Sequence, residues 1–177
     1  MKALWTNRTR NHETEKPQIH HKGRYPIMSI SKVRDLLNRK SNAVVSFISP
    51  NARAIEAARF MMANRIGSLM VQDESGQAIG IITERDILSN VSQELDGFAD
   101  RTVADVMTAD PICGLPDDEI GYITTVMKNN NIRHLPIVSN NKVVGLISMR
   151  DILDGLLEAK KVENRKLHEY LHLSGKL

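Results

Sequence analysis

The 177-residue sequence has little cysteine, because Cys113 is the one cysteine it contains. A single cysteine excludes a disulfide framework and a cysteine-based zinc site, and it is typical of a protein from a reducing compartment. The chain also has no apolar run close to the roughly 18 residues that a membrane span needs. The fractions of hydrophobic residues (41%) and charged residues (25%) are typical of a globular protein. We therefore expect no membrane association and a cytoplasmic location.

Motifs of common catalytic and cofactor sites are absent as well. The sequence contains no Walker-type loop, no GxGxxG, no CxxC and no HExxH. The acidic pair Asp117–Asp118 follows Pro116 at an expected helix start, where carboxylates interact favourably with the helix dipole. His20 and His21 are adjacent and have no acidic partner nearby, which is a weak pattern for metal ligands. We predict no enzyme activity, no catalytic cofactor and no metal site.

Charge is distributed unevenly along the chain. Residues 1–40 carry ten Lys and Arg against three Asp and Glu, which gives +7, and the remaining residues carry 14 against 18, which gives −4. The high pI therefore belongs to the N-terminal arm, and it makes nucleic acid an unlikely partner for the folded part. Residues 1–27 show no helical or strand period and predict a disordered basic tail. Two alternatives stay open: this stretch is a mitochondrial presequence, or Met28 is the true start.

Two stretches of the sequence are close copies, since GIITERDIL at 80–88 and GLISMRDIL at 145–153 share six of nine residues. Pro50 and Pro116 each precede a stretch with helical periodicity, which ends near Asn64 and Asn130. Segments 66–71 and 132–137 are each followed by a turn of hairpin type, at 73–77 and 139–142. Each half therefore predicts strand, helix, strand, turn, strand and helix. Two such halves would share a core about a pseudo-twofold axis flanked by clefts.

The repeat divides the chain into four predicted parts. These are a disordered basic tail (1–27), a first repeat with a lead-in helix (28–97), a second repeat (98–160) and a C-terminal helix extension (161–177). The expected fold class is α/β (α+β). Helical periodicity continues past Asp151 beyond what the repeat requires. We interpret these extra turns as a dimer element, and the alternative is a solvated helix packed on its own module.

Each copy of the repeated stretch has a hydroxyl residue three positions before an aspartate, where a strand gives way to a helix. Thr83 precedes Asp86, and Ser148 precedes Asp151. This spacing is that of a capping box, although capping boxes favour the longer Glu or Gln at the last position. A helix N-terminus with a hydroxyl and a carboxylate can also receive the ribose and phosphate of a nucleotide. Both interpretations stay open at this point.

The two copies, together with IRHLPIV at 132–138 and TVADVMT at 102–108, closely resemble the cystathionine β-synthase (CBS) domain family. The resemblance covers about residues 31–160 and implies two tandem β-α-β-β-α CBS repeats, an arrangement called a Bateman module. It also implies an adenine-containing ligand. AMP comes first, and ADP, ATP, NAD(H) and S-adenosylmethionine are the alternatives.

The resemblance also assigns site residues. Asp86 and Asp151 match the ribose-binding aspartate of the family, and Thr83 and Ser148 match the hydroxyl that lies beside ribose and phosphate. Both positions of the motif are present in both halves, so the resemblance implies one cleft for each copy.

Arg133 and His134 match a basic pair that faces the nucleotide phosphates in AMP-activated kinase gamma subunits. The first half departs from that pattern, because Gly67 and Ser68 stand at the equivalent positions. This departure implies one occupied site per module, or two sites that share one set of cations. The arginines of the two turns, Arg85 and Arg150, are either phosphate contacts or members of surface ion pairs.

From these observations we predict a regulatory adenine-nucleotide-binding module that senses its ligand and transmits the ligand's state to a partner or to its own oligomer. We expect a homodimer, and the sequence does not identify a regulated protein partner. The alternative is a structural or protein-interaction module whose clefts are vestigial. Nucleic-acid binding through the basic arm is a weaker third hypothesis.

Overall fold

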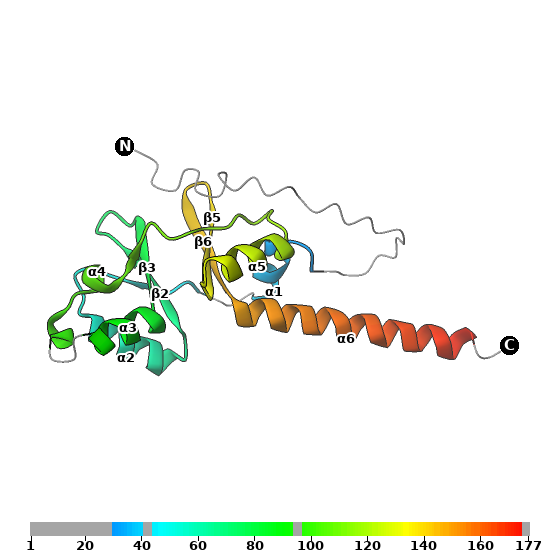
Figure 1. Cartoon of the computed structure of the whole chain (residues 1–177). Coiled ribbons are helices and arrows are strands. Elements are labelled where there is room, and N and C mark those ends of the chain that lie inside the picture. Colours follow the sequence, from blue (N-terminus) through cyan, green and yellow to red (C-terminus); the bar gives the residue numbers. More distant parts are fainter. Residues whose placement is uncertain (1–29, 41–43, 94–96, 175–177) are drawn as a thin grey trace.

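The computed structural model describes residues 30–40, 44–93 and 97–174, so the predicted tail, His20, His21 and Met28 lie outside the described residues. The chain is a mixed α+β protein in which each half contains the predicted helix, strand, turn, strand and helix (Figure 1). The elements of the first half are α1 (Val33–Arg39), β1 (Phe47–Ile48), α2 (Ala54–Asn64), β2 (Ser68–Gln72), β3 (Ala78–Thr83) and α3 (Glu84–Gln93). Those of the second half are the 3₁₀ helix η1 (Phe98–Asp100), α4 (Val103–Val106), β4 (Thr108–Ala109), α5 (Ile120–Asn129), β5 (His134–Ser139), β6 (Lys142–Ser148) and α6 (Met149–Ser174).

The strands form two sheets, and the sheet of the first repeat also takes in β4 from the second half. The first sheet has the order β1-β2-β3-β4, with β1 parallel to β2 and the other pairs antiparallel. The second consists of the antiparallel pair β5-β6, and Gly114 forms an isolated parallel bridge to Ile137. The strand that the repeat predicts before the helix at Pro116 is therefore reduced to a single bridge, next to Cys113.

The two hairpin turns have the chemistry that the sequence predicts. Gly76 has a φ of 81° in the first turn, and Asn140 and Asn141 have φ values of 50° and 60° in the second. Glycine and asparagine adopt this left-handed region more readily than other residues. Both hairpins therefore hold the strands that lead into the repeated turns.

The lead-in helix of each repeat packs against the other repeat. Lys32, directly before α1, forms an antiparallel bridge with Glu119, directly before α5. Thr102, directly before α4, forms the equivalent bridge with Arg53, directly before α2. The start of α1 is therefore joined to the second repeat, and the start of α4 to the first.

The buried side chains confirm this exchange, because they form two cores that each combine one repeat with the other's lead-in helix. One core contains Ile30, Val33, Leu36, Ile120, Ile123, Met127, Leu135, Ile137, Ile147 and Ile152. The other contains Ala54, Ala57, Met61, Leu69, Val71, Ile82, Phe98, Val103 and Val106. Removing these side chains from water is the main stabilising contribution to each half. Since each core needs residues from both repeats, we expect the two halves to fold as one unit.

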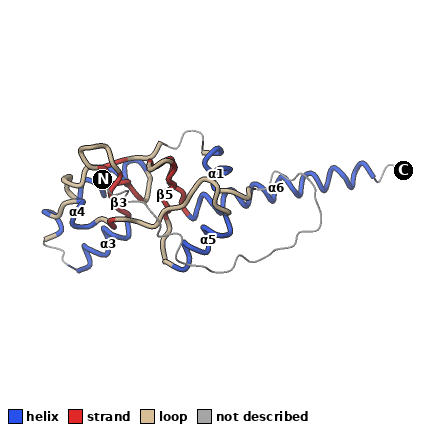
Figure 2. Tube along the Cα trace, turned by 90° about the horizontal axis from the view of Figure 1, so that it is seen from above, coloured by secondary structure: helices blue, strands red, loops and turns tan. Residues whose placement is uncertain are grey.

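Helix α6 extends from the second repeat away from the rest of the molecule (Figure 1). Helices α1 and α5 flank its beginning (Figure 2), and Ile152 at that end is 1% exposed. Further along, Leu153 and Leu157 are 55% and 60% exposed. Within the described part of the chain, no helix has the length and apolar character that crossing a membrane requires.

Candidate functional site

The turn between β3 and α3 is held by hydrogen bonds between Thr83 and Asp86. Oδ2 of Asp86 accepts from the backbone N–H of Thr83 at 2.8 Å and from its hydroxyl at 2.7 Å. The Asp86 N–H donates back to Oγ1 of Thr83 at 3.3 Å. This is a complete capping box, so the capping interpretation is confirmed here. Within the described chain, Oδ1 of Asp86 accepts no hydrogen bond.

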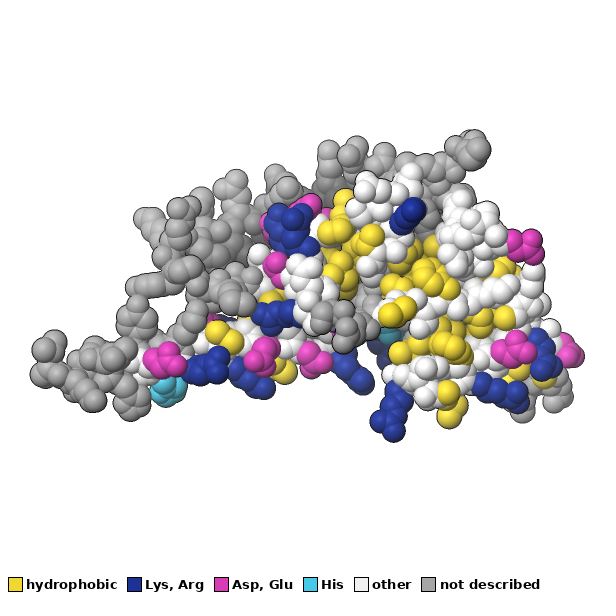
Figure 3. Space-filling view, turned by 180° about the vertical axis from the view of Figure 1, so that it is seen from behind, with side chains coloured by type: hydrophobic (Ala, Val, Ile, Leu, Met, Phe, Trp, Pro, Cys, Tyr) yellow, Lys and Arg dark blue, Asp and Glu magenta, His cyan; other side chains and the backbone are white. Residues whose placement is uncertain are grey.

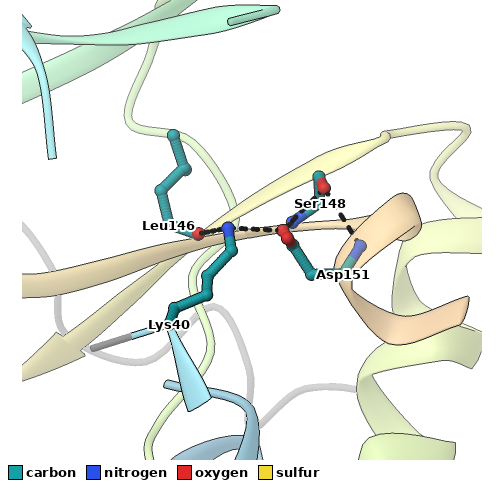
Figure 4. A network of polar contacts seen from close by, with 4 residues as sticks. All are labelled: Lys40, Leu146, Ser148 and Asp151. Carbon is teal, nitrogen blue, oxygen red and sulfur yellow. Dashed lines mark hydrogen bonds and ion pairs between the residues drawn. The ribbon is translucent and has the colours of Figure 1, made fainter. Parts of the chain in front are cut away.

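The turn between β6 and α6 repeats this geometry with one addition. Oδ2 of Asp151 accepts from the N–H and the hydroxyl of Ser148, both at 2.6 Å. It also accepts from Nζ of Lys40 at 2.6 Å, and that ammonium lies 3.3 Å from the carbonyl oxygen of Leu146 (Figure 4). Burial raises the pKa of the Asp151 carboxyl, but Lys40 and Ser148 together outweigh burial and hold the pKa below its ordinary value.

A third turn in the chain shows that aspartate at this position is an ordinary cap. In α4, Oδ2 of Asp105 accepts from the N–H of Thr102 at 2.8 Å and from its hydroxyl at 2.7 Å. Asp105 is exposed, and it is not one of the predicted site residues. The use of Asp in place of Glu in the two repeated turns is therefore not by itself a sign of a ligand.

His134 lies between the two repeats. A Cβ built on Gly67 would come within 3.1 Å of Cε1 of His134 and within 3.2 Å of Oε2 of Glu84, so these three residues converge. Burial and the neighbouring charge of Arg133 lower the pKa of His134, whereas the carboxylates of Glu84 and Asp151 oppose that shift. The predicted residue His134 is thus close to charged groups of both repeats.

The structure also shows the local contacts of the remaining arginines. Arg133 is exposed beside His134, and its carbonyl accepts from the N–H of Met149, just as Gly67 accepts from Glu84 in the first repeat. Arg85 donates from its guanidinium to the carbonyl oxygen of Asn131, so it joins the first turn to the second repeat. Arg150 is exposed.

Three residues of this region were missed by the sequence analysis: Lys40, Gly67 as a contact of His134, and Glu84. Lys40 lies 111 residues from Asp151 in the sequence and meets it because α1 packs on the second repeat. Local periodicity carries no signal for such a pairing. A signal for Glu84 was present, since it lies inside the repeated stretch where the second copy has Met149.

Other parts of the described surface do not add to this region. An open depression of about 300 Å³ is lined by Phe47, Ile48, Ser49, Gln72, Asp73 and Glu74, and it contains no predicted site residue. Among the described residues, no three His, Cys, Asp or Glu side chains are grouped so that they could hold a metal ion. Burial raises the pKa of the Cys113 thiol to about 12, which makes a reactive thiolate unfavourable.

Comparison with known proteins gives consistent matches to one family. The family model of the CBS domain matches residues 33–93 and 103–158. A curated protein of Acidianus ambivalens, an uncharacterized 17.7 kDa protein, is 36% identical over 132 residues, which are 74% of this chain and 79% of that protein.

Two solved structures with bound ligands are similar to this chain. The CBS domain protein PAE2072 from Pyrobaculum aerophilum, complexed with AMP, has a TM-score of 0.60 and 27% identity over 72% of this chain and 98% of its own. The CBS domain pair of protein MJ0100 is in complex with 5′-methylthioadenosine and S-adenosyl-L-methionine. It has a TM-score of 0.63 and 26% identity over 75% of this chain and 99% of its own.

Proposed function

The chain belongs to the CBS domain family, and we propose from this premise that it is a non-catalytic regulatory module that binds adenine nucleotides, AMP first among them. Similar CBS structures hold AMP or S-adenosylmethionine and methylthioadenosine, which supports an adenine-containing ligand. ADP, ATP and NAD(H) stay as alternatives. The ligand's state would pass to a protein partner or to the oligomer of the chain itself.

The observation that carries this proposal is the free oxygen of each capping aspartate. The hydrogen bonds described for Asp86 and Asp151 all use Oδ2, and within the described residues Oδ1 of neither side chain accepts one. A carboxylate oxygen at a helix N-terminus accepts well from the hydroxyl groups of a ribose. Capping and ribose binding are therefore compatible, because they use different oxygens of one side chain.

We assign the phosphate of the ligand to the cations of the second repeat. Arg133 is exposed and His134 is half-buried between the repeats, so an anionic group near the junction would meet both. Thr83 and Ser148 keep their proposed place beside ribose and phosphate. The guanidinium of Arg85 donates to the carbonyl oxygen of Asn131. We therefore assign Arg85 to joining the repeats, in preference to binding phosphate.

A second candidate function is a structural or protein-interaction module whose clefts are vestigial. The turn of Thr102 and Asp105 favours this candidate, because the same three hydrogen bonds occur there in a turn that lies outside the two repeated stretches. On this alternative, both repeated turns serve only to start their helices.

Measurements of ligand binding on the purified full chain distinguish the two candidate functions. Mass spectrometry of small molecules released from gently purified protein, followed by thermal unfolding with AMP, ADP, ATP, NAD(H) and S-adenosylmethionine, tests for a ligand. A saturating ligand at 100 times its dissociation constant stabilises the fold by about 2.7 kcal/mol, which raises the melting temperature by a few degrees. An unchanged melting temperature for all five compounds supports the interaction module.

We further propose that the chain forms a homodimer through its exposed apolar helix faces and α6. On the face seen in Figure 3, hydrophobic side chains gather on the part that lies away from the projecting end of α6, and α6 itself exposes Leu153, Leu156 and Leu157. The division into a tail (1–27), two repeats (28–97 and 98–160) and an extension (161–177) stays a proposal. So does the cytoplasmic location, with a mitochondrial one if the arm is a presequence.

A further inference from the structure

Lys40 is the residue at the C-terminal end of α1, and its ammonium reaches the second repeated turn. Its Nζ lies 2.6 Å from Oδ2 of Asp151 and 3.3 Å from the carbonyl oxygen of Leu146 (Figure 4). The side chains of Lys40 and Asp151 are only 31% and 18% exposed, so water screens this ion pair less than a surface pair. Leu36 and Leu37 hold α1 against Gly155 and Gly145, which fixes the end of the helix near Asp151.

The turn between β3 and α3, which carries Asp86, has no cation equivalent to Lys40 among the described residues. The offset of 70 that relates Val33–Leu37 to Val103–Met107 places Asp110 at the position of Lys40, and Asp110 has the opposite charge. The side-chain oxygens of Asp86 accept only from Thr83 within the described chain. The two turns therefore share their caps but differ in the charge that faces the carboxylate.

We infer that Lys40 is an internal counter-ion that lowers the acceptor strength of the Asp151 carboxylate, its free Oδ1 included, so the turn at Asp86 binds a ribonucleoside more tightly than the turn at Asp151. This inference rests on the proposed function and ranks its two clefts by their affinity for a ribonucleoside. A carboxylate that already accepts from two groups of Ser148 and from an ammonium is a weaker acceptor for a further hydroxyl. Lys40 thus sets the relative affinity of the clefts from outside the ligand-binding motif.

The experiment isolates the second turn and removes the cation. Asp86→Ala in the full chain removes the ribose acceptor of the first turn, so the remaining binding reports on Asp151. Adenosine is the probe because it has no phosphate that Lys40 could attract, and isothermal titration calorimetry gives its affinity. Adding Lys40→Met to Asp86→Ala should raise the adenosine affinity about tenfold, because the Asp151 carboxylate is then no longer neutralised by an ammonium and is a stronger acceptor.

Matched variants in the Asp86→Ala background assign the effect to the charge at this position. Lys40→Arg keeps the cation and should keep the weak affinity, while Lys40→Gln should show the same gain as Lys40→Met. Lys32→Met removes a lysine at the other end of α1, where Nζ lies 3.4 Å from Asp117, and should change nothing. Thermal unfolding of each variant verifies that it is folded.

An adenosine affinity that is unchanged or lower in both Lys40→Met and Lys40→Gln overturns the inference, since Lys40 would then not weaken Asp151 as an acceptor. If the wild-type chain binds adenosine or AMP while these variants show no gain, the inference fails and the proposed function stands. If the wild-type chain binds none of adenosine, AMP, ADP, ATP, NAD(H) and S-adenosylmethionine, the inference and the proposed function fail together.

Discussion

Gly155 of α6 lies directly against Leu36 of α1, since a Cβ built on Gly155 would come within 2.5 Å of Cδ2 of Leu36. The same Cβ would come within 2.9 Å of Cδ1 of Ile30. Both neighbours belong to the core that joins α1 to the second repeat. The missing side chain of Gly155 therefore permits the close approach of α1, and with it the position of Lys40.

We predict that Gly155→Ala destabilises the chain by roughly 1–3 kcal/mol, because a methyl group overpacks this contact. Gly121→Ala is the matched control, since Gly121 also lies in a helix and a Cβ there would meet nothing within 4 Å. The control should gain about 0.5–1 kcal/mol from the better helix propensity of alanine. Chemical unfolding of both variants measures the two free energies. Equal changes in both would contradict the close packing of α1 on α6.

A second prediction separates capping from ligand binding by using the third capping box. Asp86→Ala and Asp105→Ala each remove a cap with the same three hydrogen bonds, so each should lower the stability of the ligand-free protein by roughly 0.5–2 kcal/mol. Only Asp86→Ala also removes a proposed ribose acceptor. Its loss of one charge-assisted bond should weaken AMP binding at the first turn roughly ten- to hundredfold.

Calorimetric titration with AMP and unfolding in its absence give both quantities for each variant. If Asp86→Ala and Asp105→Ala both bind AMP as tightly as the wild-type chain does, Asp86 has a capping role alone. A loss of affinity in Asp105→Ala would mean that stability, and not contact with the ligand, controls binding.

The sequence predicted those features that depend on neighbouring residues. The helices after Pro50 and Pro116 and the hairpin turns with Gly76 and Asn140–Asn141 are confirmed, because periodicity and turn chemistry are local signals. The capping geometry was also readable from a spacing of three residues.

The rest depends on contacts that are distant in sequence. The exchange of lead-in helices between repeats decides which core Leu36 enters, and no local pattern distinguishes the two cores. The same exchange brings Lys40 to Asp151 across 111 positions. Asp in place of Glu at the end of the capping box does not distinguish a ligand site from a cap, because the short side chain of Asp105 also caps a helix in this chain.

A third prediction concerns pH and the burial of His134. Burial and Arg133 lower its pKa in the folded state, while Glu84 and Asp151 partly oppose the shift. The unfolded chain then binds more protons than the folded chain as pH falls through the ordinary histidine pKa of about 6.5, so folding stability falls with pH in that window. We expect a lower free energy of unfolding at about pH 5.5 than at about pH 7.5.

His134→Gln should reduce this pH dependence, and His168→Gln, on the exposed surface of α6, should retain it. Urea unfolding of the three proteins at both pH values measures the difference. A pH dependence that survives in His134→Gln and disappears in His168→Gln would place the titrating group elsewhere.

A fourth prediction tests the role of α6 in assembly. Truncation after Leu157 removes the projecting end of α6 and the partly buried Ala159, while Ile152 and the other buried residues of its core are kept. We expect the full chain to be a dimer at micromolar concentration and the truncated chain to dimerise more weakly with its fold intact. Light scattering and circular dichroism measure assembly and folding. A monomeric full chain, or a truncated chain with unchanged assembly, would exclude α6 as a dimer element.

The last prediction addresses the phosphate of the ligand. Arg133 is exposed at the junction of the repeats, next to the half-buried His134. A guanidinium interacts strongly with a phosphate through charge-assisted hydrogen bonds and has no comparable interaction with a neutral nucleoside. Arg133→Ala should therefore weaken AMP binding by about tenfold or more and leave adenosine binding nearly unchanged. Arg150→Ala is the matched control, because Arg150 is also exposed and lies at the start of α6.

The ratio of the AMP and adenosine affinities is the informative quantity, because a general loss of stability lowers both affinities together. A ratio that falls in Arg133→Ala but not in Arg150→Ala assigns the phosphate to the junction between the repeats. Equal losses for both ligands in Arg133→Ala would remove this residue from the site. A fall of the ratio in Arg150→Ala alone would move the phosphate to the first turn of α6, where the free N–H groups of the helix also attract anions.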